Sequence, residues 1–234
     1  MRTRPQSTCT RTRGFSLLEI IVVVAILSIL SGVAVPVVQK AIATAARKAT
    51  REELNVLAGA ALEYCRDTNN VPRTISDLER DPRRADSAGW AGPYVAGAIA
   101  ASATKTGYVV DGWSRDYRVT RGTTLTLTSA GDDGAFGDAN DIAIVVNFTG
   151  VRREKTLEKL KIVNQAIVAY NAAYQTSSPL PANYSTALNR LVATGFLPDR
   201  ATYLKDAWNA NFTGAPSGVA PMVKARSSSI PSTP

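Results

Sequence analysis

The chain contains no histidine and only two cysteines, Cys9 and Cys65. The missing histidines exclude Ser–His–Asp and Cys–His catalysis and the usual zinc sites with imidazole ligands, and two cysteines do not make a disulfide framework. The first fourteen residues lack acidic side chains but hold four arginines, so they supply half of the net charge of +8. The remainder carries only +4, which weakens the case for nucleic-acid binding. This composition predicts a protein that is not an enzyme.

One apolar segment is long enough to cross a bilayer, which takes about 20 residues. Residues 15–39 contain a single charged side chain, Glu19. We predict a transmembrane helix segment over residues 15–38 and a basic, cytoplasmic leader over residues 1–14. The alternative is a cleaved secretory signal, for which Gly32-Val33-Ala34 offers small residues. The length of the apolar run and the carboxylate near its start both oppose that alternative.

The start of this segment carries a family resemblance. The sequence Arg13-Gly14-Phe15-Ser16-Leu17-Leu18-Glu19, followed by the apolar stretch, resembles the class III signal of type IV prepilins and type II secretion pseudopilins. The resemblance implies that a prepilin peptidase cuts between Gly14 and Phe15 and methylates the new N-terminus at Phe15. It also implies assembly roles for Glu19 and Pro36, the fifth and twenty-second residues of the mature chain. The motif alone does not separate pilins from pseudopilins.

The chemistry of Glu19 agrees with such a role. A carboxylate in lipid costs several kcal/mol unless it is neutralised or paired. The new α-amine at Phe15 would be an equally costly cation, so stacked subunits can pair one subunit's amine with another's Glu19. The alternative is that Glu19 reaches the headgroups from the end of the helix.

Beyond the membrane segment, the pattern predicts an α+β domain over residues 39–150. An amphipathic stripe continues the helix to about Arg66, and Asn69-Asn70-Val71-Pro72 ends it. The stripe consists of Leu54, Leu57, Ala58, Ala61, Leu62 and Cys65. Its position in the stripe predicts that Cys65 is buried and inert. Residues 73–105 look irregular, and alternating β-branched residues then predict a small antiparallel sheet with strands at 108–110, 117–120, 124–128 and 142–146.

A second helix, from about Arg152 to Gln175, begins a predicted partial repeat over residues 151–225. At an offset of 106, five residues of the first helix recur in the second: Thr50, Glu52, Leu54, Ala60 and Tyr64 match Thr156, Glu158, Leu160, Ala166 and Tyr170. Each helix is followed by a proline-containing turn and then by Asp-x-Trp, at Asp111 and at Asp206. Residues 226–234 are rich in serine and proline and are predicted to be a disordered tail.

Four aspartates cluster within ten positions between the last two predicted strands of the first domain: Asp132, Asp133, Asp138 and Asp141. Carboxylates, Asn and carbonyl oxygens are the ligands that Ca²⁺ prefers, although the spacing is not that of an EF-hand. From the residues alone, a calcium site and a solvated turn are equally good interpretations.

A second resemblance bears on that loop. Asp111-Gly-Trp113 with Tyr117, followed by the Gly-rich acidic loop, resembles the major (G-type) pseudopilin of type II secretion. The resemblance spans about residues 13–147 and implies a calcium site with Asp133, Asn140 and Asp141 as ligands. Because the family more often has Asp at the position of Asn140, one ligand charge is missing, for which Asp138 or Asp132 could compensate. The C-terminal part departs from the family pattern.

The two resemblances together imply a structural subunit of a pseudopilus, with a single pass through the inner membrane and a periplasmic head. They imply as partners other copies of the chain, other pseudopilins, the prepilin peptidase and an inner-membrane assembly platform. The alternatives are a type IV pilin for adhesion, motility or DNA uptake, a membrane-tethered hydrolase that uses its carboxylates, and a binding module displayed at a filament tip.

Overall fold

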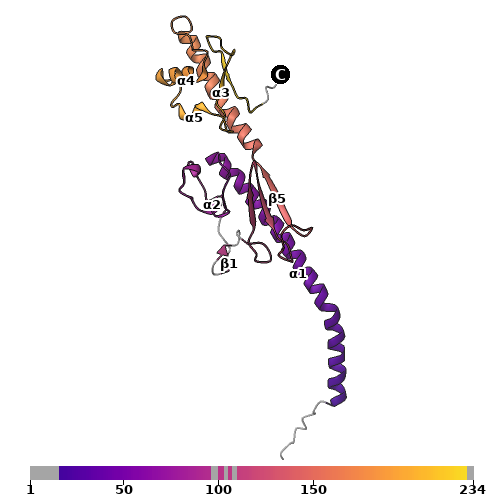
Figure 1. Ribbon diagram of the computed structural model, residues 1–234. Helices are drawn as coiled ribbons and strands as arrows, with labels where there is room; N and C mark the ends of the chain where they lie inside the picture. Colours follow the sequence, from indigo (N-terminus) through magenta and orange to yellow (C-terminus); the bar gives the residue numbers. More distant parts are fainter. Residues whose placement is uncertain (1–15, 96–99, 103–104, 107–109, 231–234) are drawn as a thin grey trace, which may run out of the picture. The chain divides into compact units, whose positions relative to one another are not determined.

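The computed structural model describes residues 16–95, 100–102, 105–106 and 110–230. Its first helix, α1, runs from Leu17 to Thr68 (Figure 1). The chain divides into two compact units between Lys48 and Ala49, so that α1 contributes to both.

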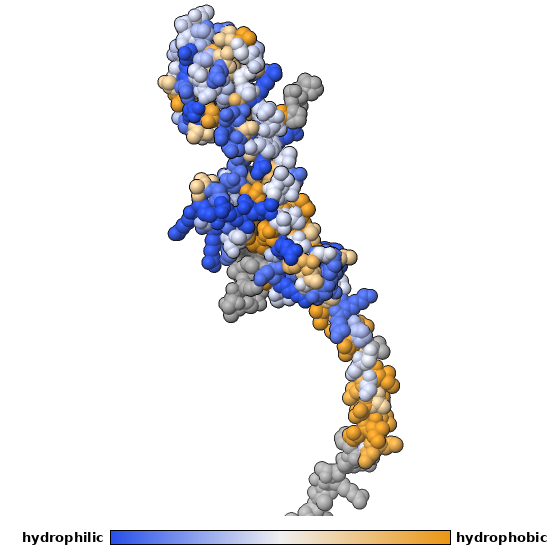
Figure 2. Space-filling view, viewed as in Figure 1, coloured by the Kyte–Doolittle hydropathy of each residue, from blue (hydrophilic) through white to orange (hydrophobic). Residues whose placement is uncertain are grey.

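The described part of the N-terminal unit is the apolar half of α1. This helix is long and apolar enough to cross a membrane, and none of its most apolar 18-residue window is buried within the chain. Leu17 and Ile29 are 78% and 71% exposed, and Figure 2 shows the hydrophobic residues gathered along this segment. Pro36 lies inside the helix. The described residues leave this apolar surface uncovered, and an exposed apolar surface of this size indicates contact with lipid or with another protein chain.

The first sheet of the second unit is a three-stranded antiparallel meander. Its strands are β3 (Arg118–Arg121), β4 (Thr124–Ser129) and β5 (Ile142–Asn147), in the order β3-β4-β5. Alternate residues of β4 are buried, which places Leu125, Leu127 and Ser129 on the core face. The predicted strands at 117–120, 124–128 and 142–146 are confirmed to within one residue at each end.

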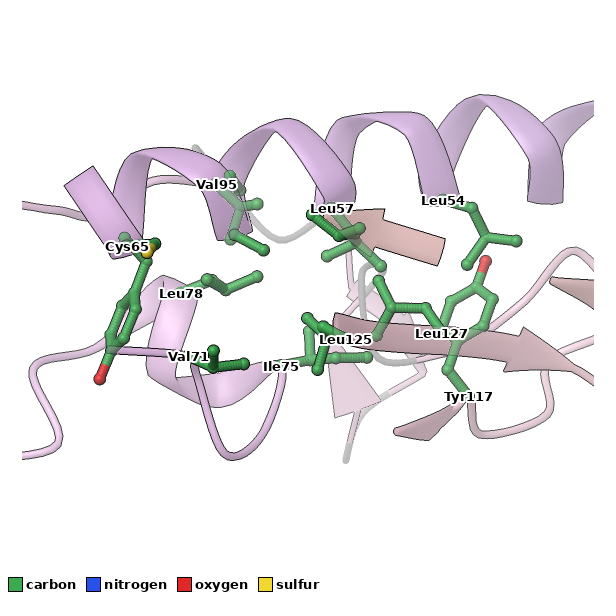
Figure 3. Close-up of a cluster of buried hydrophobic side chains, with 14 of the residues drawn as sticks. Leu54, Leu57, Cys65, Val71, Ile75, Leu78, Val95, Tyr117, Leu125 and Leu127 are labelled. Atoms are coloured by element: carbon green, nitrogen blue, oxygen red, sulfur yellow. The ribbon is translucent and has the colours of Figure 1, made fainter. Parts of the chain in front are cut away.

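The C-terminal half of α1 packs against this sheet and confirms the α+β class. Figure 3 shows Leu54 and Leu57 of the helix pointing toward Leu125 and Leu127 of β4. All four side chains are at most 2% exposed, and each such burial stabilises the fold by about 1.5–3 kcal/mol. Cys65 is fully buried in the same cluster, and burial raises the pKa of its thiol. The prediction that Cys65 is buried is therefore confirmed.

The connection from α1 to β3 holds more secondary structure than its sequence predicts. Its elements are α2 (Ser76–Glu79), the 3₁₀ helix η1 (Ala85–Ser87) and the paired strands β1 (Ala100–Ser102) and β2 (Lys105–Thr106). Leu78 of α2 is buried under α1. The strand predicted at 108–110 falls mostly outside the described residues, and Val110 forms an isolated bridge with Asp116.

The residues after β5 form a second hydrophobic cluster. It is built from α3 (Thr149–Tyr174), α4 (Tyr184–Ala193), α5 (Ala201–Leu204) and the antiparallel pair β6 (Thr213–Ala215) and β7 (Lys224–Arg226). Helix α3 begins about three residues before the predicted start. Its apolar face contributes Val163, Ile167 and Tyr170, each at most 1% exposed.

The prediction of a disordered tail over residues 226–234 is wrong for its first half. Arg226 belongs to β7, and the Ser227 hydroxyl donates a hydrogen bond of 2.7 Å to Asp206 Oδ2 in a buried position. A polar, proline-containing composition does not reveal such a bond, because the partner lies 21 residues away. Residues 231–234 lie outside the described residues.

Candidate functional site: the acidic loop and its supports

The acidic loop, residues 130–141, connects the end of β4 to the start of β5. Three glycines in it have positive φ: Gly131, Gly134 and Gly137. At Gly131 a side chain would also collide with the other end of the loop, since a Cβ atom there would lie 2.6 Å from the Asn140 carbonyl oxygen. Glycine at this position therefore permits the two ends of the loop to close on each other.

The carboxylates of the loop mainly accept hydrogen bonds from its own backbone. The Ala135 N–H donates to Asp133 Oδ1 at 2.8 Å, and the Asn140 N–H donates to Asp138 Oδ1 at 3.1 Å. The Gly137 N–H donates to Asp141 Oδ2 at 2.8 Å. Hydrogen bonds from the Ala135 N–H and the Asn140 side chain lower the pKa of Asp133. These bonds tie three of the four aspartates to the backbone of the loop.

Two oxygens of the loop are buried without a hydrogen-bond partner, Asn140 Oδ1 and Asp141 Oδ1. A buried acceptor left in this way costs about 1–3 kcal/mol, which a bound cation would offset. Across the described residues, no group of three or more His, Cys, Asp and Glu side chains is close enough together to hold a metal. Any cation would therefore rely on amide and carbonyl oxygens as well as carboxylates, which suits Ca²⁺ better than a transition metal.

Arg115 is a support of this loop that the sequence analysis did not identify. Its guanidinium donates to the Gly131 carbonyl oxygen at 2.6 Å and to the Asp132 carbonyl oxygen at 3.0 Å. It also lies over Gly134, where a Cβ atom would be 2.8 Å from Cζ. A fixed positive charge thus already sits on the acidic loop. The sequence feature that could have identified Arg115 is its position two residues after the Asp-x-Trp motif.

Asp111, the acid of the Asp-x-Trp motif, joins three parts of the head. Its Oδ1 accepts the N–H groups of Trp113 and Arg115, and its Oδ2 accepts the Ser129 hydroxyl at 2.5 Å. The Gly112 N–H donates to Thr50 Oγ1 at 2.9 Å. We call Thr50, Asp111 and Ser129 the first clamp. It fixes the turn after Asp111 to helix α1 and to the residue at which the acidic loop begins.

The N-terminal site residues divide between described and undescribed parts. Gly14 and Phe15 lie outside the described residues. Glu19 is in the first turn of α1, and its N–H donates to Ser16 Oγ at 3.2 Å, so Ser16 caps the helix. The predicted role of Glu19 in assembly therefore remains a prediction, on a side chain that is exposed in the single chain.

Comparison with known families gives two matches. Residues 9–35 match the prokaryotic N-terminal methylation motif, and residues 37–148 match the type II secretion system (T2SS), protein G. No curated protein and no solved structure matches the chain. The second match ends at residue 148, immediately before α3, so the second hydrophobic cluster lies outside both matched regions.

Proposed function

The chain belongs to the type II secretion pseudopilin family. From this premise we propose that it is an inner-membrane protein with a periplasmic head. Copies of it would assemble into a periplasmic filament that drives protein export. Matches to both the methylation motif and protein G favour this over a type IV pilin. Because the matched family is not a class of enzymes, we also propose that the carboxylates of this chain have no catalytic role. The observation that carries the proposal is an unburied apolar helix joined to a folded head in one chain.

Polymerisation through α1 accounts for its exposed surface. Its first 26 residues present large apolar side chains that the chain itself does not cover, among them Ile21, Leu27 and Val37 at 57%, 56% and 63% exposure. In the membrane these side chains contact lipid, and in a filament they contact the helices of other copies. We propose that the prepilin peptidase first cuts between Gly14 and Phe15. The basic leader then stays cytoplasmic and the head is periplasmic, in line with the positive-inside rule.

A secretion assay tests this function. In the source bacterium, deletion of the gene should leave the substrates of its type II pathway in the periplasm, and the full chain supplied in trans should restore export. Total synthesis of those substrates serves as the control. Normal export without the gene, together with lost surface fibres or motility, would assign the chain to a pilus.

We further propose that the acidic loop binds Ca²⁺ through Asp133, Asn140 and Asp141, with Asp138 or Asp132 as a supplementary ligand. Support comes from the two buried oxygens without partners on Asn140 and Asp141. The ion would supply a positive charge that links the loop's two ends. An extracytoplasmic site can work at a weak affinity of about 10⁻⁴–10⁻³ M, because calcium is plentiful there.

Calcium should therefore raise the melting temperature of the full chain in detergent above its value in EDTA. A hundredfold excess over the dissociation constant adds about 2.7 kcal/mol, and each kcal/mol shifts the midpoint by about 2–4 °C in a domain of this size. Magnesium should do less, because it demands octahedral geometry. Asp133→Ala and Asp141→Ala should abolish the increment, and Asn140→Asp should enlarge it by restoring a charge.

Arg115 provides a matched control for this measurement. Arg115→Met removes two hydrogen bonds and a positive charge from the loop but no cation ligand. It should lower the midpoint in EDTA while leaving a calcium increment at least as large as that of the unchanged chain. Identical melting curves in EDTA and in millimolar calcium would reduce the loop to an acidic turn.

A further inference from the structure

Asp206, the acid of the second Asp-x-Trp motif, makes the same bonds as Asp111 in a different part of the chain. Its Oδ1 accepts the N–H groups of Trp208 and Ala210, both at 2.9 Å. Its Oδ2 accepts the Ser227 hydroxyl at 2.7 Å, and the Ala207 N–H donates to Thr156 Oγ1 at 3.0 Å. We call Thr156, Asp206 and Ser227 the second clamp. Its three side chains are at most 9% exposed.

The turns held by the two clamps have the same backbone conformation. In the first, the Asp111 N–H donates to the Arg115 carbonyl at 2.7 Å, and in the second the Asp206 N–H donates to the Ala210 carbonyl at 2.8 Å. The third residue after each aspartate has a positive φ, 64° at Ser114 and 68° at Asn209. A positive φ is uncommon for residues other than glycine. Its occurrence at the same position of both turns therefore supports a common backbone conformation.

The strands after these turns keep the same register. The seventh residue after each aspartate pairs with the residue that precedes the clamp serine: Arg118 pairs with Thr128, and Thr213 pairs with Arg226. Beyond the strand, each serine Oγ accepts the N–H two residues on, from Gly131 and from Ser229, at 3.1 Å in both cases. The correspondence therefore extends from the turn through two paired strands to the residue after them.

The helices and the aromatic contacts correspond as well. Tyr64 and Tyr170, both 1% exposed, lie fourteen residues after Thr50 and Thr156. Tyr64 meets the ring of Tyr94 edge-on at 5.8 Å, and Tyr170 meets the ring of Phe196 edge-on at 5.5 Å. The backbone N–H groups of Tyr94 and Phe196 each donate to a helix earlier in the chain, to the carbonyls of Leu78 in α2 and Leu191 in α4, at 2.8 and 2.9 Å.

The two regions differ on the C-terminal side of the clamp serine. After Ser129 the chain enters the acidic loop and continues into β5. After Asp206, by contrast, the sequence contains no further Asp or Glu. The described region around the second clamp thus has the helix, the turn and the strand pair, but no acidic loop.

We propose that residues 149–229 are a second copy of the head module formed by residues 49–131, and that the Thr–Asp–Ser clamp is the positioning device that both copies share. One membrane helix then carries two modules of the same design. The second module closes on its clamp without a cation, whereas the first also carries the acidic loop. This last contrast rests on the proposed calcium site, but the duplication does not.

Hydrogen–deuterium exchange of the full chain in detergent tests the proposal with matched variants. Asp111→Ala should raise amide exchange in residues 110–131, and Asp206→Ala should raise it in residues 203–229, each on the order of tenfold or more. Each variant should leave the other module unchanged. Thr50→Val and Thr156→Val should act in the same direction more weakly, and Thr→Ser at either position should restore protection, because the hydroxyl is the group that accepts the bond.

The outcomes separate the claims. Unchanged exchange in residues 203–229 after both Asp206→Ala and Thr156→Val would overturn the second clamp. Loss of protection in both modules from either aspartate variant would overturn the claim of two modules. Should an aspartate variant fail to fold, the comparison of Thr→Val with Thr→Ser at the same position still tests the clamp.

A second comparison uses CaCl₂ in place of EDTA. Calcium should slow exchange only in residues 130–142, and equal slowing in residues 203–229 would overturn the proposal that the second module closes without a cation. Slowing in neither region would defeat the calcium site and leave the duplication standing.

Discussion

A Gly14→Val chain should accumulate as a precursor that keeps residues 1–14, remains inserted in the membrane and does not enter filaments. A peptidase site shaped for glycine excludes the valine side chain, so the cut before Phe15 fails. Because the cut fails, the α-amine at Phe15 that would pair with Glu19 never forms. The leader, with four arginines and no acid, also stays attached to the helix. Intact mass spectrometry of the membrane fraction measures the retained fourteen residues directly.

Gly32→Val is the matched control for that substitution. A Cβ atom at Gly32 would have nothing within 4 Å, so the chain should accept a side chain there and still be processed after Gly14. The same control also tests the secretory-signal alternative, because Gly32 belongs to the small-residue segment that a signal peptidase would use. A mature N-terminus at Val35 in the unchanged chain would contradict assignment of the cut to Gly14.

Glu19→Leu should insert at least as well as the unchanged chain but assemble poorly. Removing a carboxylate from an apolar span favours insertion. In the filament, however, the amine of a neighbouring Phe15 would be left in lipid without its partner. Removing one member of a buried ion pair costs about 3–5 kcal/mol, and each 1.4 kcal/mol is a factor of ten. Filament yield should therefore fall by on the order of 10²–10⁴-fold, measured by shearing and quantifying assembled protein.

Ser16→Ala separates the charge of Glu19 from the structure of the helix end. Ser16 Oγ accepts the Glu19 N–H, and loss of such a cap costs about 0.5–2 kcal/mol. Glu19→Leu keeps this backbone bond, so a pairing role predicts a small effect of Ser16→Ala and a large effect of Glu19→Leu. Equal yields from both variants would show that Glu19 acts only through the helix terminus.

The sequence specified the elements whose pattern is local. The stripe of Leu54, Leu57 and Cys65 predicted the buried face of α1, because the helix repeat puts these positions on one side. Alternation in residues 124–128 predicted β4 and its inward residues for the same kind of reason. The apolar run after Gly14 likewise predicted a helix long and apolar enough to cross a membrane, because length and composition are also local properties.

Groups whose hydrogen-bond partners are distant in the chain could not be predicted from the sequence. Ser129 lies 18 residues from Asp111, and Ser227 lies 21 residues from Asp206. Neither separation leaves a periodic signal, which is why Ser227 was assigned to a disordered tail. The role of Arg115 could not be predicted for a related reason. Its guanidinium donates hydrogen bonds to backbone carbonyl oxygens, and every residue has such a group, so the sequence does not mark the partner.

By itself, then, the sequence predicted an N-terminal helix apolar enough to cross a membrane, an α+β head and a second helix with a second Asp-x-Trp motif, and the structure contains all three. The period of the hydropathy pattern, the charge distribution and the short motifs are properties of neighbouring residues, so they can be recognised from the sequence without the tertiary structure. Only the tertiary structure decided what the two aspartates do. Each lies buried at the meeting of a helix, a turn and a strand end, where its charge is compensated by a hydroxyl and two N–H groups. A buried carboxylate needs such donors, and the fold alone brings them together.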